Sequence, residues 1–322
     1  MSGDPRIHRH ILAARTVVVA PKRADRPNDL EKPSGTPAEG CPFCAGHESL
    51  TPPALLHAPE TADSPWHARI IPNRYPIVER LGDRAGNDPS VRPAHGIHDV
   101  VIESADHHRS ILDIDATRWR EVWSLVRRRL AMLDGADRIA WATVFKNSGP
   151  AAGASLEHVH SQLIGLDFVP PVMETELAAF LEPGHSFGDL IRWAEAHGCV
   201  VAEAADLVAM IPPAPRQPLE TWILPREPEP HFHATSHERV AALADLTRRI
   251  VATIDRAAPG ADYNWWLHQA PCGGRAVGGW HWHLEILPRL APFAGFELAT
   301  GCHSTTLSPE DSARRMAAAG EA

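Results

Sequence analysis

The sequence lacks the long apolar segments of membrane proteins and secretory precursors. It has no run of about 18 apolar residues, so no membrane-spanning helix is predicted. The N-terminus, MSGDPRIHRH, has no apolar signal-peptide core, which favours a cytoplasmic location. Basic residues do not outnumber acidic ones, because 31 Lys and Arg against 40 Asp and Glu give a net charge of −9. We therefore expect neither a membrane nor nucleic acid as a partner.

Cysteine and tyrosine are scarce as well. Five cysteines in 322 residues are too few for a disulfide scaffold, and two tyrosines stand against 20 histidines and 10 tryptophans. Hydrophobic residues make up 44% of the chain, which is enough for a sizeable core and argues against wholesale disorder. Because histidine is so abundant, the chemistry of the protein is expected at histidine clusters.

Two parts of the chain repeat one order of elements. The first is predicted to contain a helix from Asp115 to about Leu133, a strand over 141–147, a Gly/Ala loop over 148–155 and a strand over 158–165. The second is predicted to contain a helix capped by Ser236, a strand over 263–269, a Gly-rich loop over 271–279 and a strand over 281–287. This shared order indicates duplication. We expect an α+β fold with halves at 1–170 and 171–322, each a mostly antiparallel sheet with a long helix.

The first histidine cluster is a His-x-His-x-Gln motif. On a strand, alternate side chains face the same side, so His158, His160 and Gln162 share a face. The small residues of the loop 148–155 leave backbone N–H groups bare, and Ser155 adds a hydroxyl, which favours a phosphate site. An imidazole beside such a loop suits nucleophilic attack on phosphorus, and the alternative is a polar, solvated strand face.

A single Cys-x-x-Cys motif indicates a zinc site. Cys41 and Cys44 have the spacing of two ligands on one zinc ion, and two further ligands are needed for a tetrahedron. Because no second Cys-x-x-Cys exists, the candidates are His158 and either His107 or His108. The alternative is a redox motif, but a thioredoxin-like redox site requires a strand before the motif and a helix after it. Neither pattern is present here.

A second His-x-His motif lies behind the second Gly-rich loop. His281 and His283 share one face of the predicted strand 281–287. They form a second wall of the active site, a second metal position, or a pair of packed, hydrogen-bonded histidines.

Together these segments resemble the galactose-1-phosphate uridylyltransferase family, a transferase branch of the histidine-triad superfamily. The resemblance covers nearly the whole chain and is carried by APKRADRP at 20–27, CPFC at 41–44, PNRYP at 72–76, HDVVIES at 98–104, FKN to the His-x-His-x-Gln motif at 145–162, and 281–288. It implies two histidine-triad-like halves, with the zinc site and the nucleophile in the first. It also implies a homodimer.

The resemblance assigns roles to individual residues. His160 is implied as the nucleophile, with Gln162 and Ser155 beside it. The implied zinc ligands are Cys41, Cys44, His107 and His158, and the implied substrate contacts are Arg23, Arg26, Asn73, Asn147, Glu297 and His303. A second metal site, for iron or zinc, is implied at Glu176, His281 and His283, with a fourth ligand near Pro228 or, in its place, His231 or His233.

Several positions depart from the family pattern. Ala291, Phe296 and His303 stand where the family has lysine, tyrosine and glutamine in the sugar-phosphate pocket. Arg74 stands where an aspartate is frequent in the base pocket, and Val159 replaces a proline between the two histidines. These changes affect the predicted specificity for the sugar and the base more than they affect the prediction of nucleotidyl transfer.

The implied function is transfer of a nucleoside monophosphate between a nucleotide sugar and a sugar 1-phosphate through a covalent histidine. UDP-glucose–hexose-1-phosphate uridylyltransferase, an enzyme of galactose metabolism, is the leading form. Gln162 stands where hydrolytic relatives have a third histidine, and an amide cannot act as a base, so transfer is favoured over hydrolysis. The alternatives are a phosphorylase that splits an ADP-sugar or a dinucleoside polyphosphate, and a zinc-stabilised nucleotide-binding module without catalysis.

Overall fold

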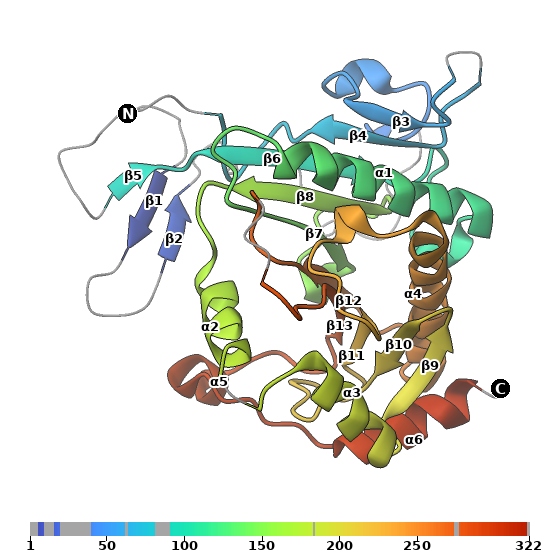
Figure 1. The fold of residues 1–322 in the computed structure, drawn as a ribbon. Coiled ribbons are helices and arrows are strands. Elements are labelled where there is room, and N and C mark those ends of the chain that lie inside the picture. The colour runs from blue at the N-terminus through green and yellow to red at the C-terminus, as the bar shows by residue number, and fades with distance from the viewer. Residues whose placement is uncertain are drawn as a thin grey trace.

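A single ten-stranded antiparallel sheet forms the centre of the molecule (Figure 1). The computed structural model describes residues 6–9, 16–19, 40–61, 64–80, 91–182, 184–273 and 277–320. In spatial order the strands are β3 (Leu56–Ala58), β4 (Ala68–Pro72), β6 (Gly96–Ile102), β8 (His160–Leu166), β7 (Trp141–Ser148), β12 (Tyr263–His268), β13 (His283–Pro288), β11 (Thr221–Pro225), β10 (Leu207–Met210) and β9 (Val200–Ala204). All neighbouring strands in this sheet pair antiparallel.

The two predicted halves meet where β7 pairs with β12. In this pairing Asn147 lies opposite Asn264 and Phe145 opposite Trp266. The predicted α+β class with antiparallel strands and long helices is confirmed, but the halves contribute to one continuous sheet instead of forming one sheet each. Pairing β7 with β12 joins two strands that would otherwise be exposed sheet edges. Side chains of the second half thereby come next to β7, which is itself the neighbour of β8, the strand that begins at His160.

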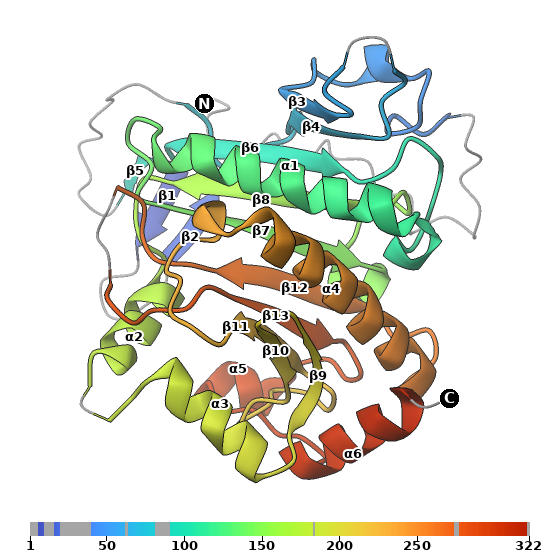
Figure 2. The ribbon, with the colours of Figure 1, turned by 45° about the vertical axis from the view of Figure 1, so that its right-hand side comes forward.

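Two long helices lie side by side on one face of the sheet (Figure 2). They are α1 (Ala116–Asp134) and α4 (His237–Ala257). Both begin at the predicted caps: Asp115 accepts hydrogen bonds from two N–H groups of the first turn of α1, and the Ser236 hydroxyl accepts one from Arg239 N–H. Trp119 and Trp123 of α1 pack on Trp265 of β12, with ring centroids 5.9 and 6.0 Å apart. The hydrophobic core therefore lies between these helices and the sheet.

The remaining elements were only partly predictable. They are α2 (Pro171–Phe180), α3 (Phe187–Ala196), α5 (Gly295–Thr300), α6 (Pro309–Gly320) and a three-stranded sheet with the order β2 (Thr16–Val19), β1 (Arg6–Arg9), β5 (Val91–Pro93). The segment 205–235 contains β10 and β11, with four prolines between them. Among the described residues no helix is long and apolar enough to cross a membrane.

Candidate active site

The side chain of His160 is held in the form that a nucleophile requires. Strand β8 begins at His160, so His158 and Val159 precede the strand and do not belong to it. Nδ1 of His160 donates a hydrogen bond to the backbone carbonyl of His158 over 2.8 Å. The proton therefore resides on Nδ1, and Nε2 carries the lone pair that could attack phosphorus. The imidazole also packs against the edge of Phe43, with ring centroids 5.4 Å apart.

The four predicted zinc ligands lie together beside this strand. The ligand atoms of Cys41, Cys44, His107 and His158 are all within 4.8 Å of one another. Nδ1 of His158 lies 3.5 and 3.6 Å from the two sulfurs, and Nδ1 of His107 lies 3.3 Å from the Cys44 sulfur. Ligand atoms in a tetrahedral zinc site are separated by about 3.3–3.8 Å, given the usual bond lengths. Of the two alternatives His107 and His108, the fold brings His107 into the group.

The protonation states of these side chains suit a metal cation. Burial lowers the pKa of His158 to about 4, so its imidazole is neutral. Its Nε2–H donates to the Ser104 carbonyl over 2.9 Å, which leaves Nδ1 to face the sulfurs. Burial and the neighbouring Cys41 raise the pKa of the Cys44 thiol to about 12, a cost that a bound cation would remove by stabilising the thiolates. The residues therefore fit a structural zinc ion.

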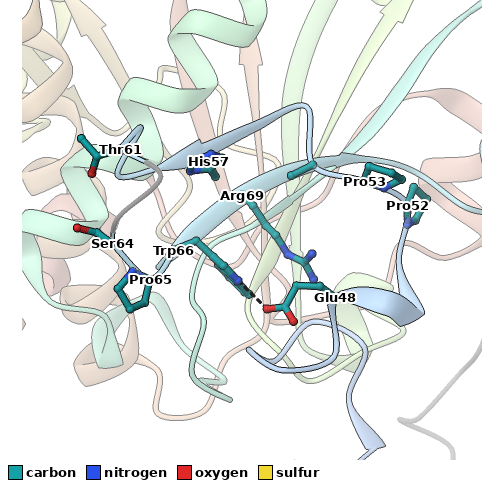
Figure 3. Close-up of a pocket in the computed structure, with 10 residues that line it drawn as sticks. Glu48, Pro52, Pro53, His57, Thr61, Ser64, Pro65, Trp66 and Arg69 are labelled. Atoms are coloured by element: carbon teal, nitrogen blue, oxygen red, sulfur yellow. Dashed lines mark hydrogen bonds between the residues drawn. The ribbon is translucent and has the colours of Figure 1, made fainter.

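Arg69 also contacts the loop that carries the Cys-x-x-Cys motif. The Arg69 side chain is buried and donates to the Pro42 carbonyl over 3.5 Å, while its guanidinium lies 4.6 Å from the Trp66 ring centroid. The indole of Trp66 in turn donates to the Glu48 carboxylate over 2.7 Å (Figure 3). Glu48, Trp66 and Arg69 line a cavity of about 360 Å³. The cavity that contains His160 is a different one.

The cavity at the predicted nucleophile has a volume of about 200 Å³. It is lined by Arg109, Lys146, Asn147, Ser148, Gly149, Pro150, Ala154, Leu156, Glu157, His158, Val159 and His160. Asn147 was predicted as a substrate contact. Arg109 was not predicted, although it follows the expected zinc ligand by two residues; it pairs with Glu157 over 2.9 Å and is more than half exposed. An exposed guanidinium at this cavity is suited to bind a phosphate oxygen.

The loop 148–155 is hydrogen-bonded more fully than the sequence predicts. The N–H of Ala151 donates to the Asp262 carboxylate over 2.6 Å, and the N–H groups of Gly153 and Ala154 donate to carbonyls within the loop. The prediction that the backbone donors are bare is therefore wrong for these three groups. Ser155 is buried and does not line the cavity, although both of its neighbours do.

The second half of the chain holds this loop in place. Besides Asp262, the Asn264 amide donates to Asn147 Oδ1 over 2.8 Å and to the Ala152 carbonyl over 2.9 Å. Both residues belong to the segment that enters β12 and pairs with β7. The shape of the loop 148–155 thus depends on contacts between the halves.

Substitution of Gly149 by alanine is expected to lower activity by about 100-fold, because misplaced catalytic groups carry costs of that order. Gly149 has φ +86°, and a Cβ atom there would lie 1.8 Å from Asp262 Oδ1. Asp262 would have to move, and its bond to Ala151 would be lost. Gly153→Ala is the matched control, since Gly153 has φ +80° and no atom within 4 Å of the added Cβ. Steady-state rates of the two variants check this, and equal losses would contradict the role of Asp262.

A histidine outside the predicted set orients Gln162. His98 Nδ1 accepts a hydrogen bond from Ile77 N–H over 3.0 Å, so its proton resides on Nε2. That Nε2–H donates to Gln162 Oε1 over 3.0 Å, and the Asn73 amide nitrogen lies 3.1 Å from the same Nε2. With its oxygen occupied, Gln162 has its NH₂ group to offer to a phosphoryl oxygen. The spacing of the sequence motif gave no signal for His98.

A buried ion pair lies beneath His160. Lys146 Nζ donates to Glu103 over 2.6 Å and to the backbone carbonyl of His160 over 2.8 Å. The Ser161 hydroxyl donates to the other Glu103 oxygen. The Lys146 and Glu103 side chains are only 2% and 1% exposed, and burial lowers the pKa of Lys146. Sequence analysis missed this pair, whose members are 43 residues apart.

The other predicted substrate contacts are not part of this cavity. Arg23 and Arg26 lie outside the described residues. Glu297, on α5, accepts from Ala294 N–H over 2.9 Å, and hydrogen bonds from this and other backbone N–H groups lower its pKa to about 2. The His303 ring packs on Phe293 with centroids 4.9 Å apart. No residue of α5 lines the cavity at His160.

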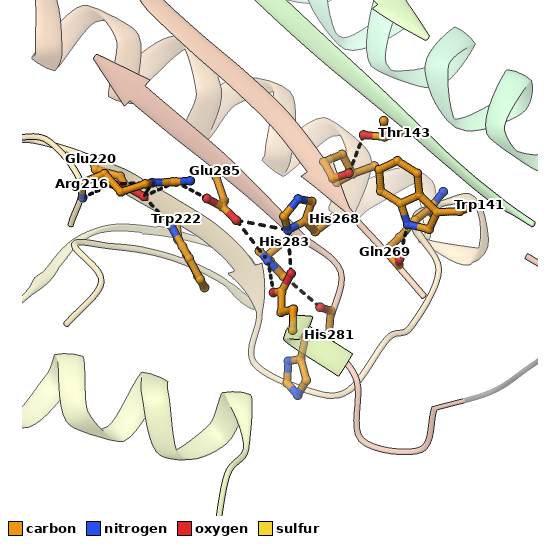
Figure 4. A network of polar contacts seen from close by, with 12 residues as sticks. Trp141, Thr143, Arg216, Glu220, Trp222, His268, Gln269, His281, His283 and Glu285 are labelled. Carbon is orange, nitrogen blue, oxygen red and sulfur yellow. Dashed lines mark hydrogen bonds and ion pairs between the residues drawn. The ribbon is translucent and has the colours of Figure 1, made fainter. Parts of the chain in front are cut away.

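A second group of possible metal ligands lies between β12, β13 and α2 (Figure 4). Glu176 contacts His268 Nδ1 over 2.8 Å and His283 Nε2 over 2.9 Å. Glu285 lies 3.2 Å from His268 Nδ1. Although burial opposes it, Glu176 and Glu285 raise the pKa of His283 to about 10. Carboxylates and imidazoles held together in this way fit iron or zinc.

The membership of this group corrects the predicted ligand set. His281 Nδ1 donates to the Pro225 carbonyl over 2.8 Å, and its ring is set apart from those of His268 and His283 (Figure 4). His268 takes its place because it lies directly opposite His283 in the pairing of β12 with β13. His231 and His233, the suggested substitutes near Pro228, belong to a different cluster.

Comparison with known proteins agrees with this architecture. A profile described as the N-terminal domain of galactose-1-phosphate uridyl transferase matches residues 5–170, and one described as a domain of unknown function matches residues 121–321. The ADP-glucose phosphorylase of Arabidopsis thaliana is 31% identical over 97% of this chain and 92% of its own length. The galactose-1-phosphate uridylyltransferase of Haemophilus influenzae is 25% identical over 95% and 91%.

A solved structure of a uridylyltransferase matches 98% of both chains, with a TM-score of 0.81 and 26% identity. The first profile covers more than half of the chain, and the similarity to the Arabidopsis protein extends over nearly all of it. The chain is therefore an enzyme of the galactose-1-phosphate uridylyltransferase family, whose chemistry is nucleotidyl transfer or phosphorolysis.

Proposed function

We propose that this enzyme splits an ADP-sugar with inorganic phosphate and passes through a covalent nucleotidyl–His160 intermediate. The choice of reaction rests on the 31% identity to an ADP-glucose phosphorylase over 97% of the chain. The choice of nucleophile rests on the hydrogen bond that places the His160 proton on Nδ1. This proposal takes the phosphorylase alternative as the leading form and the uridylyltransferase as the second.

The reaction consists of two displacements at the same phosphorus. His160 Nε2 attacks the α-phosphorus, the bond from phosphorus to the bridging oxygen breaks, and a sugar 1-phosphate leaves. An oxygen of inorganic phosphate then attacks the same phosphorus, the P–N bond breaks, and ADP leaves. Nδ1 keeps its proton throughout, and the His158 carbonyl stabilises the positive charge on the ring. The attacking phosphate is already anionic and needs no general base.

Other side chains of the chain support these steps. The Gln162 NH₂ group, aligned by His98, and the Arg109 guanidinium offer hydrogen bonds to the non-bridging oxygens, on which charge accumulates. Bound zinc would hold Cys41, Cys44, His107 and His158 together and so fix the residues that precede His160. The second group, with Glu176, His268 and His283, is proposed as a further iron or zinc site.

The predicted sugar-phosphate pocket supports phosphate as the acceptor. Residue 291, where the family has a lysine, is an alanine. Because α5 contributes nothing to the cavity at His160, we also propose a homodimer in which α5 of one subunit completes the site of the other.

A UDP-glucose–hexose-1-phosphate uridylyltransferase is the second candidate. It is favoured by the match to a uridylyltransferase structure over 98% of both chains. It shares the His160 intermediate and differs only in the base and in the second acceptor.

Intact-mass measurement with alternative donors and acceptors tests the proposal. ADP-glucose is expected to add one nucleoside monophosphate to the protein, and phosphate is expected to remove it with formation of ADP. Water is expected to remove it slowly, because Gln162 stands where hydrolytic relatives have a third histidine and an amide cannot act as a base. An adduct formed only from UDP-glucose and removed only by galactose 1-phosphate would favour the uridylyltransferase. No adduct from either donor would favour the nucleotide-binding module.

A further inference from the structure

A third cluster of metal-binding side chains lies away from both groups described above. It consists of Asp134, His231 and His233, whose ligand atoms are all within 4.8 Å of one another. Asp134 is the last residue of α1 in the first half. The two histidines belong to the connection between β11 and α4 in the second half, where a short 3₁₀ helix, η7, spans Phe232–Ala234. None of the three lines the cavity at His160.

The fold holds the two histidines in a defined place. Between them, Phe232 is fully buried, with its ring 5.7 Å from Trp123 and 5.1 Å from Trp282. The Phe232 N–H also donates to the Gln269 side chain over 3.0 Å. The two imidazole rings on either side have centroids 5.2 Å apart and are half-buried. Packing of Phe232 in the core thus fixes the relative positions of His231 and His233 before any ion binds.

The carboxylate of the cluster is oriented in the same way. Gly273 N–H donates to Asp134 Oδ1 over 3.2 Å, and the Cys272 thiol donates to the same carboxylate. The other oxygen, Oδ2, lies 3.9 Å from His233 Nε2. Asp134 also lies at the C-terminal end of a 19-residue helix, where the helix dipole disfavours a negative charge. A cation at this position would offset that repulsion.

One nitrogen atom of the cluster has no hydrogen-bond partner among the described residues. Within the described ranges, Nδ1 of His233 is buried and has no hydrogen-bond partner. A buried polar atom without a partner has a free-energy cost, which an ion bound through this nitrogen would remove.

We propose that Asp134, His231 and His233 bind one divalent transition-metal ion, with zinc as the best match. Two imidazoles and one carboxylate are donors that select zinc-like ions over magnesium or calcium, which prefer oxygen ligands. Three protein ligands leave one position for water. The bound ion would tie the end of α1 to the segment that enters α4, and so join the two halves on the helical face of the sheet.

Zinc binding by the double variant His231→Ala/His233→Ala tests this site. After dialysis of the full-length protein against micromolar zinc, the variant is expected to retain one zinc ion fewer per chain than the wild type. Added zinc is also expected to raise the melting temperature of the wild type more than that of the variant. The matched control is His185→Ala/His197→Ala, which removes two exposed histidines elsewhere and should retain all of the zinc.

A second variant covers the case in which the double variant does not fold. Asp134→Asn keeps the shape of the side chain and is expected to weaken zinc binding at this site by at least about tenfold, because the charged ligand is lost. Equal zinc content and equal zinc-dependent stabilisation in the wild type and the variants would overturn the proposal.

Discussion

Replacement of His160 by alanine is expected to abolish formation of the nucleotidyl adduct and to lower turnover by about four to six orders of magnitude, as seen when other enzymes lose a nucleophile. The reason is chemical: alanine has no lone pair to replace that of His160 Nε2, which the hydrogen bond from Nδ1 to the His158 carbonyl leaves unprotonated. Intact-mass measurement after incubation with ADP-glucose and with UDP-glucose, together with steady-state rates, checks this.

The control for this experiment is His108→Ala. His108 directly follows the candidate zinc ligand His107 but is not part of the zinc group. Its Nε2 lies 3.9 Å from Asp106 Oδ2. Its removal is expected to leave both the adduct and the rate nearly unchanged. If the His160 variant keeps a normal melting temperature and still forms an adduct, the nucleophile is another residue.

The largest expected effect on stability comes from Lys146→Met. This change leaves the Glu103 carboxylate, 1% exposed, without its cation. Removing one partner of a buried pair typically costs about 3–5 kcal/mol, because the remaining charge stays buried without compensation. The variant also loses the bond from Lys146 to the His160 carbonyl, so a reduced kcat should accompany the lower free energy of unfolding. Urea unfolding followed by tryptophan fluorescence measures the first effect.

Two further variants separate the buried charge from the general effect of substitution. In Lys146→Met/Glu103→Gln both charges are gone, and much of the lost stability should return. Arg120→Met breaks the Arg120–Asp245 pair on the surface of α1 and α4, where both side chains are over 40% exposed and solvent screens the charges, and should have little effect on stability. The interpretation fails if Lys146→Met is no more destabilising than Arg120→Met.

Local features of the site could be predicted from the sequence because they depend on residues close together in the chain. Asp115 and Ser236 begin their helices by accepting hydrogen bonds from N–H groups two or three residues later. The His-x-His spacing and the Cys-x-x-Cys spacing likewise carry their chemistry within a few residues. The family resemblance then supplied His107, which no spacing rule could separate from His108.

Features that depend on sheet register could not be predicted in this way. His268 joins Glu176 and His283 only because β12 pairs with β13 in the register that places His268 opposite His283. One residue of slip would turn His268 to the other face of the sheet. His281 lies two residues before His283 in the sequence, but its Nδ1–H donates a hydrogen bond to a backbone carbonyl instead.

The sequence by itself therefore determined the α+β class, the helix starts, the nucleophile candidate and the two cysteines of the candidate zinc site, since periodicity, capping and motif spacing are short-range properties. Only the tertiary structure decided which partners these residues meet. Asp262 accepts a hydrogen bond from the loop 148–155, whose N–H groups were expected to be bare. Lys146 pairs with Glu103 beneath His160, and Asp134 lies beside two histidines from the other half. Each of these contacts joins residues at least 43 positions apart. The contact of Asp262 depends on the pairing of β7 with β12, that of Lys146 on the pairing of β6, β8 and β7, and that of Asp134 on the packing of α1 beside the short helix η7.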